Sequence, residues 1–335
     1  MSYKRFLPLL YLCLLVACFA CRQAPEEQVV NTDGWHRPVE NPVFTTDFGN
    51  NHDAIILVDS SQTPRKYYLL LSGWQCDKTE NGKPLTYLWR TTDFSWESAN
   101  WELIDPNYNI GCQYEYDDAV WIDGTCYIYE DGLVYTHSGA LEDASGKWKV
   151  AGSFPKEKCD DVGVFYENGI FHLFGEFGAC DIKNDGAAIS HFVSTTGIGD
   201  WQLVDSLVIN PNTDGSGKIG VGDPTIFKYK NAYYILCDME TATEPYFITM
   251  WKADSLNAKF TRTTINLTAR NNEVEHWDNY CIQDAEVIYL PEKKTWVMAC
   301  NMRDKDGNPG PLSKFPYLRK FSRVVGFFYA TDPAE

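Results

Sequence analysis

The stretch Gly222–Glu240, GDPTIFKYKNAYYILCDME, contains the pattern that decides the fold. It begins with an acidic residue in a Gly-Asp-Pro corner, and two short apolar runs follow with a polar turn between them. Two short β-prone runs joined by a turn predict a β-hairpin. The pattern occurs five times, and its leading residues are Asp53, Asp118, Asp161, Asp223 and Asp284. They are 65, 43, 62 and 61 positions apart, and a repeat of roughly 40 to 60 residues is typical of a propeller or an array.

Each hairpin is followed by a third β-prone run, and four of the five repeats have a fourth run. No segment shows a sustained helical period. Because the last repeat lacks a fourth run, the N-terminal segment 35–44 is expected to supply it and close the ring. The sequence therefore predicts an all-β protein, a five-bladed β-propeller with about four antiparallel strands per blade, over residues 35–335. Three tryptophans recur at the start of the fourth run and are expected to pack between blades: Trp101, Trp148 and Trp201.

Residues 1–21 have the features of a signal peptide with a lipobox. Lys4 and Arg5 precede an apolar core that is too short to span a bilayer, and Leu-Val-Ala-Cys ends at Cys18. Cys18 is the expected lipidation site, and residues 22–34 are expected to form a flexible tether. The protein is therefore expected to be exported and lipid-anchored, in the periplasm or on the outer cell surface. It would meet the membrane only through its N-terminal lipid, and a monomer is expected.

Composition limits the possible partners. The net charge of −17 argues against a nucleic-acid partner, because phosphate binding needs clustered Lys and Arg. Eight cysteines follow the leader without a CxxC pair, which argues against a zinc site. Cys159 and Cys180 bracket one hairpin and could pair, whereas Cys237 and Cys300 occupy matching places that favour small core residues. The disulfide pattern stays open.

The five leading aspartates are expected to form a ring at one mouth of the channel. The first strand of a propeller blade lies innermost, so an acidic residue at its start faces the channel. An aspartate can also cap a turn through its own backbone. Five close carboxylates are costly unless they bind a ligand or share protons, and this favours a functional mouth. No cofactor is expected, with a calcium ion in the channel as the alternative, since carboxylate oxygens suit calcium.

With these repeats and aspartates, the chain resembles the five-bladed propeller glycoside hydrolases of families 43, 32, 68, 117 and 130, and family 43 in particular. The resemblance implies a glycoside hydrolase acting on a plant or algal poly- or oligosaccharide. Family 43 enzymes use a base Asp on the first blade, a pKa-tuning Asp on the third and an acid Glu at the start of the fourth. The matching positions are Asp53 in Asn-His-Asp-Ala, Asp161 in Cys-Asp-Asp-Val and Asp223 in Gly-Asp-Pro. Asp223 departs from the family's Glu, and the first-blade motif lacks the usual Pro.

The chemistry of glycosidic bonds agrees with the roles that the resemblance implies for these residues. Cleavage needs a proton on the leaving oxygen and a nucleophile at the anomeric carbon, and two carboxyl groups with different pKa values supply both. We expect an inverting reaction with Asp53 as base, Asp161 as tuner and Asp223 as proton donor. Other acid candidates are Glu176 and Glu240, which are expected farther from the mouth, together with Glu286 and His276. The residues expected to bind substrate are His52, Trp74, Asp118, Trp121, His276, Asp284 and Glu286.

Two alternative functions remain. The first is a non-catalytic glycan-binding lipoprotein on a degenerate propeller. It stays an alternative because Asp223 occupies the position where the family has its catalytic Glu. The second is a phosphorylase like those of family 130, which would need a basic cluster at the mouth to hold phosphate. Arg303, Lys305 and Arg319 are the residues that could form it. Phosphate-dependent turnover, or binding without turnover, would separate these functions from hydrolysis.

Overall fold

A computed structural model describes most of the chain. The described residues are 30–32, 34–37, 49–61, 63–75, 85–95, 100–111, 116–177, 187–211, 219–241, 246–267, 281–303 and 323–334. Of residues 30–32, 37, 49–53, 73–75, 85, 219, 240–241, 303 and 323–324, the backbone alone is described. The signal peptide and Cys18 lie outside these ranges. Within them, no helix has the length and apolar character needed to cross a membrane.

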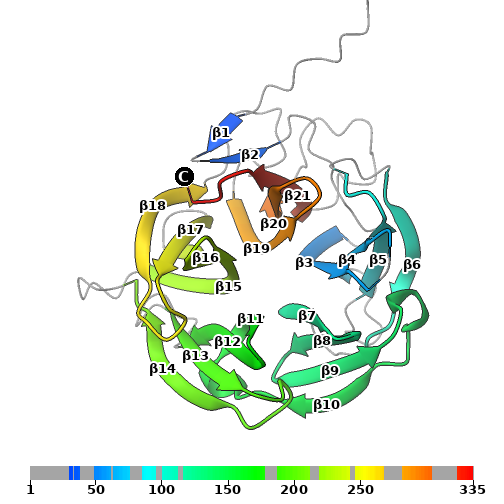
Figure 1. The fold of residues 1–335 in the computed structure, drawn as a ribbon, viewed down its shortest axis with the longest axis horizontal. Coiled ribbons are helices and arrows are strands. Elements are labelled where there is room, and N and C mark those ends of the chain that lie inside the picture. The colour runs from blue at the N-terminus through cyan, green and yellow to red at the C-terminus, as the bar shows by residue number, and fades with distance from the viewer. Residues whose placement is uncertain are drawn as a thin grey trace, which may run out of the picture.

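The strands form five blades around a central axis, as the sequence predicts (Figure 1). Blade 1 contains β3 (Gly49–Asp59), β4 (Lys66–Gln75), β5 (Leu85–Thr91) and β6 (Glu102–Tyr108). Blade 2 contains β7 (Asp118–Ile122), β8 (Thr125–Glu130), β9 (Leu133–Ser138) and β10 (Lys149–Ser153). Blade 3 contains β11 (Asp160–Glu167), β12 (Ile170–Phe177), β13 (Ala188–Ser194) and β14 (Gln202–Ile209). Blade 4 contains β15 (Ile219–Tyr229), β16 (Ala232–Thr241), β17 (Phe247–Ala253) and β18 (Thr261–Leu267).

The N-terminal segment completes blade 5, as expected. This blade contains β19 (Cys281–Leu290), β20 (Thr295–Arg303) and β21 (Arg323–Ala330), and β2 (Trp35–Arg37) pairs with β21 as its fourth strand. Trp35 is fully buried and donates its indole N–H to the Pro333 carbonyl at 3.1 Å, so the two ends of the chain are fastened together. A further strand, β1 (Val30–Thr32), pairs with β2. It lies inside the stretch expected to be a tether.

The core lies between neighbouring blades, and the recurring tryptophans pack there. Trp101 of blade 1 stacks on Phe327 of blade 5 at a centroid distance of 6.3 Å. Trp148 of blade 2 packs against the cluster shared with blade 1. Trp201 of blade 3 meets Tyr129 of blade 2 edge to face. Each tryptophan therefore contacts the preceding blade, which confirms the expected packing role.

The described cysteines behave as core residues. Cys126, Cys159, Cys237, Cys281 and Cys300 are buried and unbonded to one another. Cys237 and Cys300 occupy equivalent places opposite the first strands of blades 4 and 5, as the repeat predicts. Cys180 lies outside the described residues, so its proposed pairing with Cys159 stays a prediction.

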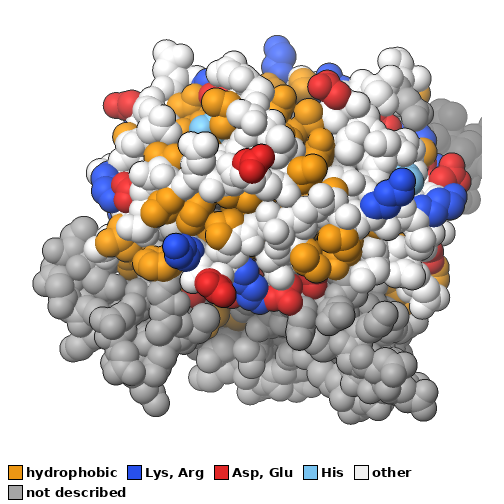
Figure 2. Space-filling view, turned by 90° about the horizontal axis from the view of Figure 1, so that it is seen from below, with side chains coloured by type: hydrophobic (Ala, Val, Ile, Leu, Met, Phe, Trp, Pro, Cys, Tyr) orange, Lys and Arg blue, Asp and Glu red, His pale blue; other side chains and the backbone are white. Residues whose placement is uncertain are grey.

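The rim of the propeller carries scattered apolar side chains among polar ones (Figure 2). Several belong to outer strands, with Val150 of β10 59% exposed and Leu203 of β14 52% exposed. Isolated exposed apolar residues are normal on a protein surface.

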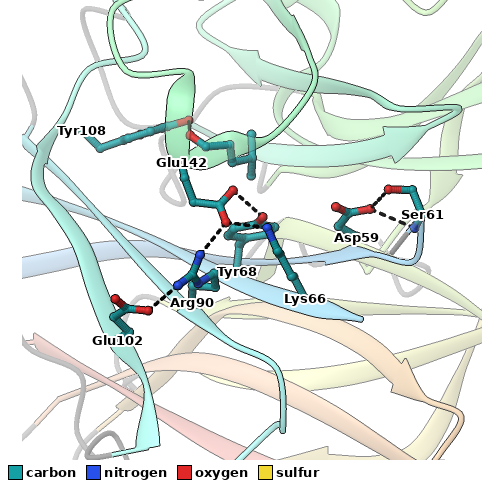
Figure 3. Close-up of polar contacts among 9 residues, drawn as sticks. Asp59, Ser61, Lys66, Tyr68, Arg90, Glu102, Tyr108 and Glu142 are labelled. Carbon is teal, nitrogen blue, oxygen red and sulfur yellow. Dashed lines mark hydrogen bonds and ion pairs between the residues drawn. The ribbon is translucent and has the colours of Figure 1, made fainter. Parts of the chain in front are cut away.

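A cluster of charged residues joins blade 1 to blade 2 (Figure 3). Glu142 lies in the 3₁₀ turn Leu141–Asp143, and its carboxylate accepts hydrogen bonds from Lys66 at 2.8 Å, Arg90 at 2.7 Å and the Tyr68 hydroxyl at 2.7 Å. Burial alone would raise the pKa of Glu142, but these three donors lower that pKa to about 2. The ionised carboxylate is therefore strongly favoured in the folded protein.

Glu142→Gln is expected to lower the free energy of unfolding at pH 7 by about 1.5–3 kcal/mol, the range for hydrogen bonds to charged groups. Lys66 and Arg90 would keep their charges and lose the shared anion. The stabilisation is complete above the ordinary Glu pKa of 4.5 and disappears as the pH falls toward about 2. Urea unfolding at pH 7 and pH 3 measures both effects. The control Glu102→Gln, at an exposed partner of Arg90, should change stability by about 0–1 kcal/mol; equal losses in both variants at every pH would refute the prediction.

Candidate active site

The leading aspartates of blades 3, 4 and 5 share an unusual backbone conformation. Asp161, Asp223 and Asp284 have φ angles of 40°, 47° and 53°. At each of them the pairing with the second strand shifts by one residue. Such bulges re-aim a side chain, and positive φ in a non-glycine residue is uncommon and concentrates at functional sites. The backbone conformation therefore sets the direction in which each of these three carboxyl groups points.

A small cavity lies where the five first strands meet. Its volume is about 30 Å³, enough for two or three water molecules at roughly 10–15 Å³ each and too small for a sugar ring. Every blade contributes to its wall, with Ala54, Ile55, Asp117, Asp118, Asp161, Val162, Asp223, Pro224, Asp284, Ala285 and Glu286. The predicted ring of carboxyl groups is thus present in the described part of the site.

The strand packing places Asp53 at the position equivalent to the other leading aspartates. Ala54 of blade 1 lines the cavity, as do Val162, Pro224 and Ala285, which directly follow the leading aspartates of blades 3, 4 and 5. The register of β3 against β4 also shifts, between Asn51 and Ala54. The side chains of His52 and Asp53 lie outside the description, so their roles stay predictions.

Asp223, the predicted proton donor, has a strongly raised pKa. Burial raises the pKa of its carboxyl group well above the ordinary value of 3.8. Four neighbouring carboxyl groups raise it further: Asp284, Asp161, Asp238 and Glu176. A carboxyl group in this environment keeps its proton at a pH where ordinary aspartates are ionised. Asp223 can therefore act as an acid.

Asp284 is held by neutral donors and by a neighbouring acid. Its carboxylate accepts hydrogen bonds from the side-chain amides of Gln283, at 3.1–3.2 Å, and of Asn301. Its main-chain N–H donates to both oxygens of Asp238, at 3.1 and 3.3 Å. Oxygens of Asp223, Asp238 and Asp284 lie within 4.8 Å of one another. Protein donors engage two of these three groups, so we assign no cation to them, and the calcium ion stays a prediction.

Asp118 links blade 2 to blade 3. Its side chain is 5% exposed, and its carboxylate accepts the main-chain N–H groups of Ala119 at 2.6 Å and Val164 at 2.5 Å. Burial raises the pKa of Asp118 to about 7, although these two N–H groups lower it. The residue lines the cavity, but its hydrogen bonds give it a structural role beside the expected contact with substrate.

Glu286 and Asp117 complete the group of acids that line the cavity. Burial and the charge of Asp118 raise the pKa of Glu286 well above its ordinary value, and the Thr225 hydroxyl donates to Glu286 at 3.4 Å. Asp117 lines the same cavity, and its Oδ2 atom is buried without a hydrogen-bond partner among the described residues. Burial, followed by the charge of Asp161, raises the pKa of Asp117. Asp117 was adjacent to the predicted ring but was not among the predicted site residues.

Two expectations need correction. Glu176 is not a peripheral carboxylate: it is 6% exposed and its charge acts on Asp223, because β12 brings it opposite Asp160 at the start of β11. Trp121 is not placed to stack on a sugar at the mouth. It stacks on Tyr68 at 6.1 Å, within the contact between blades 1 and 2, since it lies toward the far end of β7.

The remaining predicted residues lie outside the description. They are the side chains of Trp74 and Glu240, and His276 as a whole. The same applies to the residues considered for phosphate binding: the side chain of Arg303, and Lys305 and Arg319 as a whole. Their predicted roles are unchanged.

A second tier of polar residues lies behind the leading aspartates, and sequence reasoning singled out only one of its members, Glu176, as an acid candidate. Glu176, Asp238 and Asn301 occupy equivalent places on second strands, opposite Asp160, Gly222 and Gln283. All three are buried. The available signal was their common offset from the hairpin turn in each repeat.

A close backbone approach fixes blade 3 against blade 4 beside the site. A Cβ atom at Gly163 would lie 1.8 Å from the Pro224 carbonyl oxygen. Gly163→Ala is therefore expected to lower the free energy of unfolding by about 1–3 kcal/mol or more and to move Asp223 relative to Asp161. Thermal melts measure the first effect. Gly199→Ala, whose Cβ would meet nothing within 4 Å, is the control; if both variants melt alike, the close approach is unimportant.

No protein-family model matches the sequence, and no curated protein matches it either. Solved structures do match the fold. A thermostable family-43 glycoside hydrolase superimposes with a TM-score of 0.59 at 14% identity, covering 88% of this chain and 94% of that chain. The catalytic domain of the Coprinopsis cinerea GH62 α-L-arabinofuranosidase gives 0.58 at 12% identity, covering 90% and 98%.

The α-L-arabinofuranosidase PaAbf62A from Podospora anserina, solved in complex with cellotriose, gives a TM-score of 0.58 at 14% identity, covering 88% of this chain and 96% of that chain. The chain thus has the five-bladed propeller fold found in family-43 and family-62 glycoside hydrolases. At these identities, the similarity establishes the fold.

Proposed function

We propose that this protein is a glycoside hydrolase that cleaves O-glycosyl bonds at the mouth of the propeller. The observation that carries the proposal is the environment of Asp223, a half-buried residue whose carboxyl group is surrounded by other carboxyl groups that favour its protonated form. A protonated acid beside ionisable partners is what acetal cleavage requires. The fold shared with known glycoside hydrolases supports the same function.

The proposed reaction uses carboxyl groups and water. Asp223 gives its proton to the glycosidic oxygen as the bond to the anomeric carbon breaks. Asp53 accepts a proton from the attacking water, whose oxygen forms the new bond to that carbon. The products are a sugar hemiacetal and an alcohol, and proton exchange with solvent restores both carboxyl groups. Asp161 affects the protonation of Asp223 through its charge, which agrees with its expected tuning role.

The substrate is a poly- or oligosaccharide. Two of the similar structures are α-L-arabinofuranosidases, so arabinose-containing plant glycans are the first to test. The described cavity, at about 30 Å³, is too small for a sugar ring, so the sugar would bind above it, where the side chains of His52 and Trp74 and the residue His276 are expected. Inversion of configuration is proposed from the opposed positions of the acid and base blades. Export and lipid anchoring at Cys18 are proposed from the sequence alone.

The function is tested by incubating the wild-type protein with arabinans, xylans, galactans and algal polysaccharides and measuring released reducing ends. Release from one class, independent of phosphate and with the inverted anomer formed first in a ¹H NMR time course, is the expected result. Phosphate-dependent release would instead indicate a phosphorylase. No release, with retardation on one glycan in an affinity gel, would replace the hydrolase by a binding protein.

A further inference from the structure

Asp238 is a buried acid to which the proposed reaction assigns no step. It lies on β16, is 0% exposed and faces Gly222 in the strand pairing. Its carboxylate accepts the main-chain N–H of Asp284 at 3.1 and 3.3 Å. Asp284 has a φ of 53°, a conformation that needs support from its surroundings. The contact therefore ties β16 of blade 4 to the bulge of β19 in blade 5.

The same carboxylate is close enough to Asp223 to affect its proton. Oxygens of Asp223, Asp238 and Asp284 are all within 4.8 Å of one another, and like charges this close cannot all ionise freely. Asp284 receives donors from Gln283 and Asn301, and Asp238 receives the N–H of Asp284. Because N–H donors stabilise a carboxylate, we expect the negative charge on Asp238, whereas burial and the neighbouring acids raise the pKa of Asp223.

We propose that Asp238 is a positioning residue for the acid: its fixed negative charge keeps the proton on Asp223, and its bond to the Asp284 N–H keeps the third carboxylate in place. This proposal rests on the function proposed above. Among the described side chains, the charged groups that act on Asp223 from the packed strands are acidic: Asp161 on β11, Glu176 on β12, Asp238 on β16 and Asp284 on β19.

The first test is the pH profile of Asp238→Asn, which preserves size and can still accept the Asp284 N–H. Removing one negative charge lowers the pKa of Asp223, so the acid loses its proton at lower pH. The alkaline limb of the pH profile of kcat/KM should move to lower pH by about one unit or more. Relative to the wild type, the variant should therefore lose about tenfold more kcat/KM at pH 8 than at pH 5. Asp205→Asn, the same change on the outer strand β14, should leave the limb in place. A uniform loss at every pH in Asp238→Asn overturns the proposal.

A second test needs no substrate and so separates this proposal from the proposed function. Protein labelled with ¹³C at the aspartate carboxyl carbon is titrated by NMR, and the Asp223 resonance is assigned by its loss in Asp223→Asn. Its midpoint should be lower in Asp238→Asn than in the wild type. A lower midpoint in a protein that hydrolyses no glycan supports the role of Asp238 while the hydrolase function fails. An unchanged midpoint overturns the role of Asp238.

Discussion

Asp223→Asn is expected to lose about 10²–10⁴-fold of the hydrolysis of a natural glycan and to remain folded. An amide cannot give a proton to the leaving oxygen, and sugar alkoxides are poor leaving groups. The wild-type carboxyl group has a raised pKa, so it lowers stability progressively as the pH rises above 3.8, the ordinary value. The variant should therefore melt at the same temperature as the wild type or higher at pH 7, which differential scanning calorimetry measures.

The role of Asp223 as acid can be separated from a binding role by the leaving group. The dinitrophenolate of a dinitrophenyl glycoside is a good leaving group that departs without being protonated. Asp223→Asn should therefore lose far less activity on this substrate than on the glycan. Asp223→Glu introduces the residue type found at this position in family 43, which the chain resembles. This variant should keep part of the activity on the glycan that Asp223→Asn loses. Equal losses on both substrates would show that Asp223 is not the proton donor.

Asp53→Asn is expected to lose about 10²–10⁴-fold on the glycan and on the dinitrophenyl glycoside alike. A base acts on the attacking water, and that step is needed whatever group departs. Azide is a nucleophile that needs no deprotonation, so it should restore part of the activity by forming a glycosyl azide. Initial rates with both substrates, with and without azide, give the measurement.

The control for this variant is Asp105→Asn on β6, the outer strand of the same blade, which should keep wild-type rates. A loss confined to the glycan would instead assign Asp53 to leaving-group chemistry. Full activity of Asp53→Asn would exclude it as the base and direct attention to the other cavity-lining acids.

Much of the fold could be predicted from the sequence because the repeats encode it locally. In blades 1, 2 and 4, the third β-prone run of the repeat is a strand: β5 (Leu85–Thr91), β9 (Leu133–Ser138) and β17 (Phe247–Ala253). The alternation of apolar residues identifies strands, and the recurring tryptophans mark one packing position. The missing fourth run of the last repeat correctly indicated that the N-terminal segment closes the ring, through Trp35 and the strand that it begins.

The site was predictable only in its first layer. The leading aspartates can be recognised in the sequence because they repeat. The bulges that turn Asp161, Asp223 and Asp284 toward the cavity cannot be recognised from the alternation of apolar and polar residues. Asp238 and Glu176 are buried acids, which is rare enough that a surface position was the natural expectation for Glu176. Their partners also come from neighbouring strands and blades.

Trp121 shows the opposite error. Trp121 is expected near a blade edge, where it could stack on a sugar, but it lies three residues beyond Asp118 on β7, about 10 Å along the strand from the mouth. There it stacks on Tyr68 of the neighbouring blade.

The most direct measurement of the central claim is the initial rate of reducing-sugar release by the Asp53→Asn/Asp223→Asn double variant, beside the two single variants and the wild type. Residues that act together in one reaction have strongly non-additive effects. We expect the double variant to be about as inactive as the less active of the two single variants, while its melting profile shows a folded protein. Release at the wild-type rate by the folded double variant would contradict the account and place the activity elsewhere.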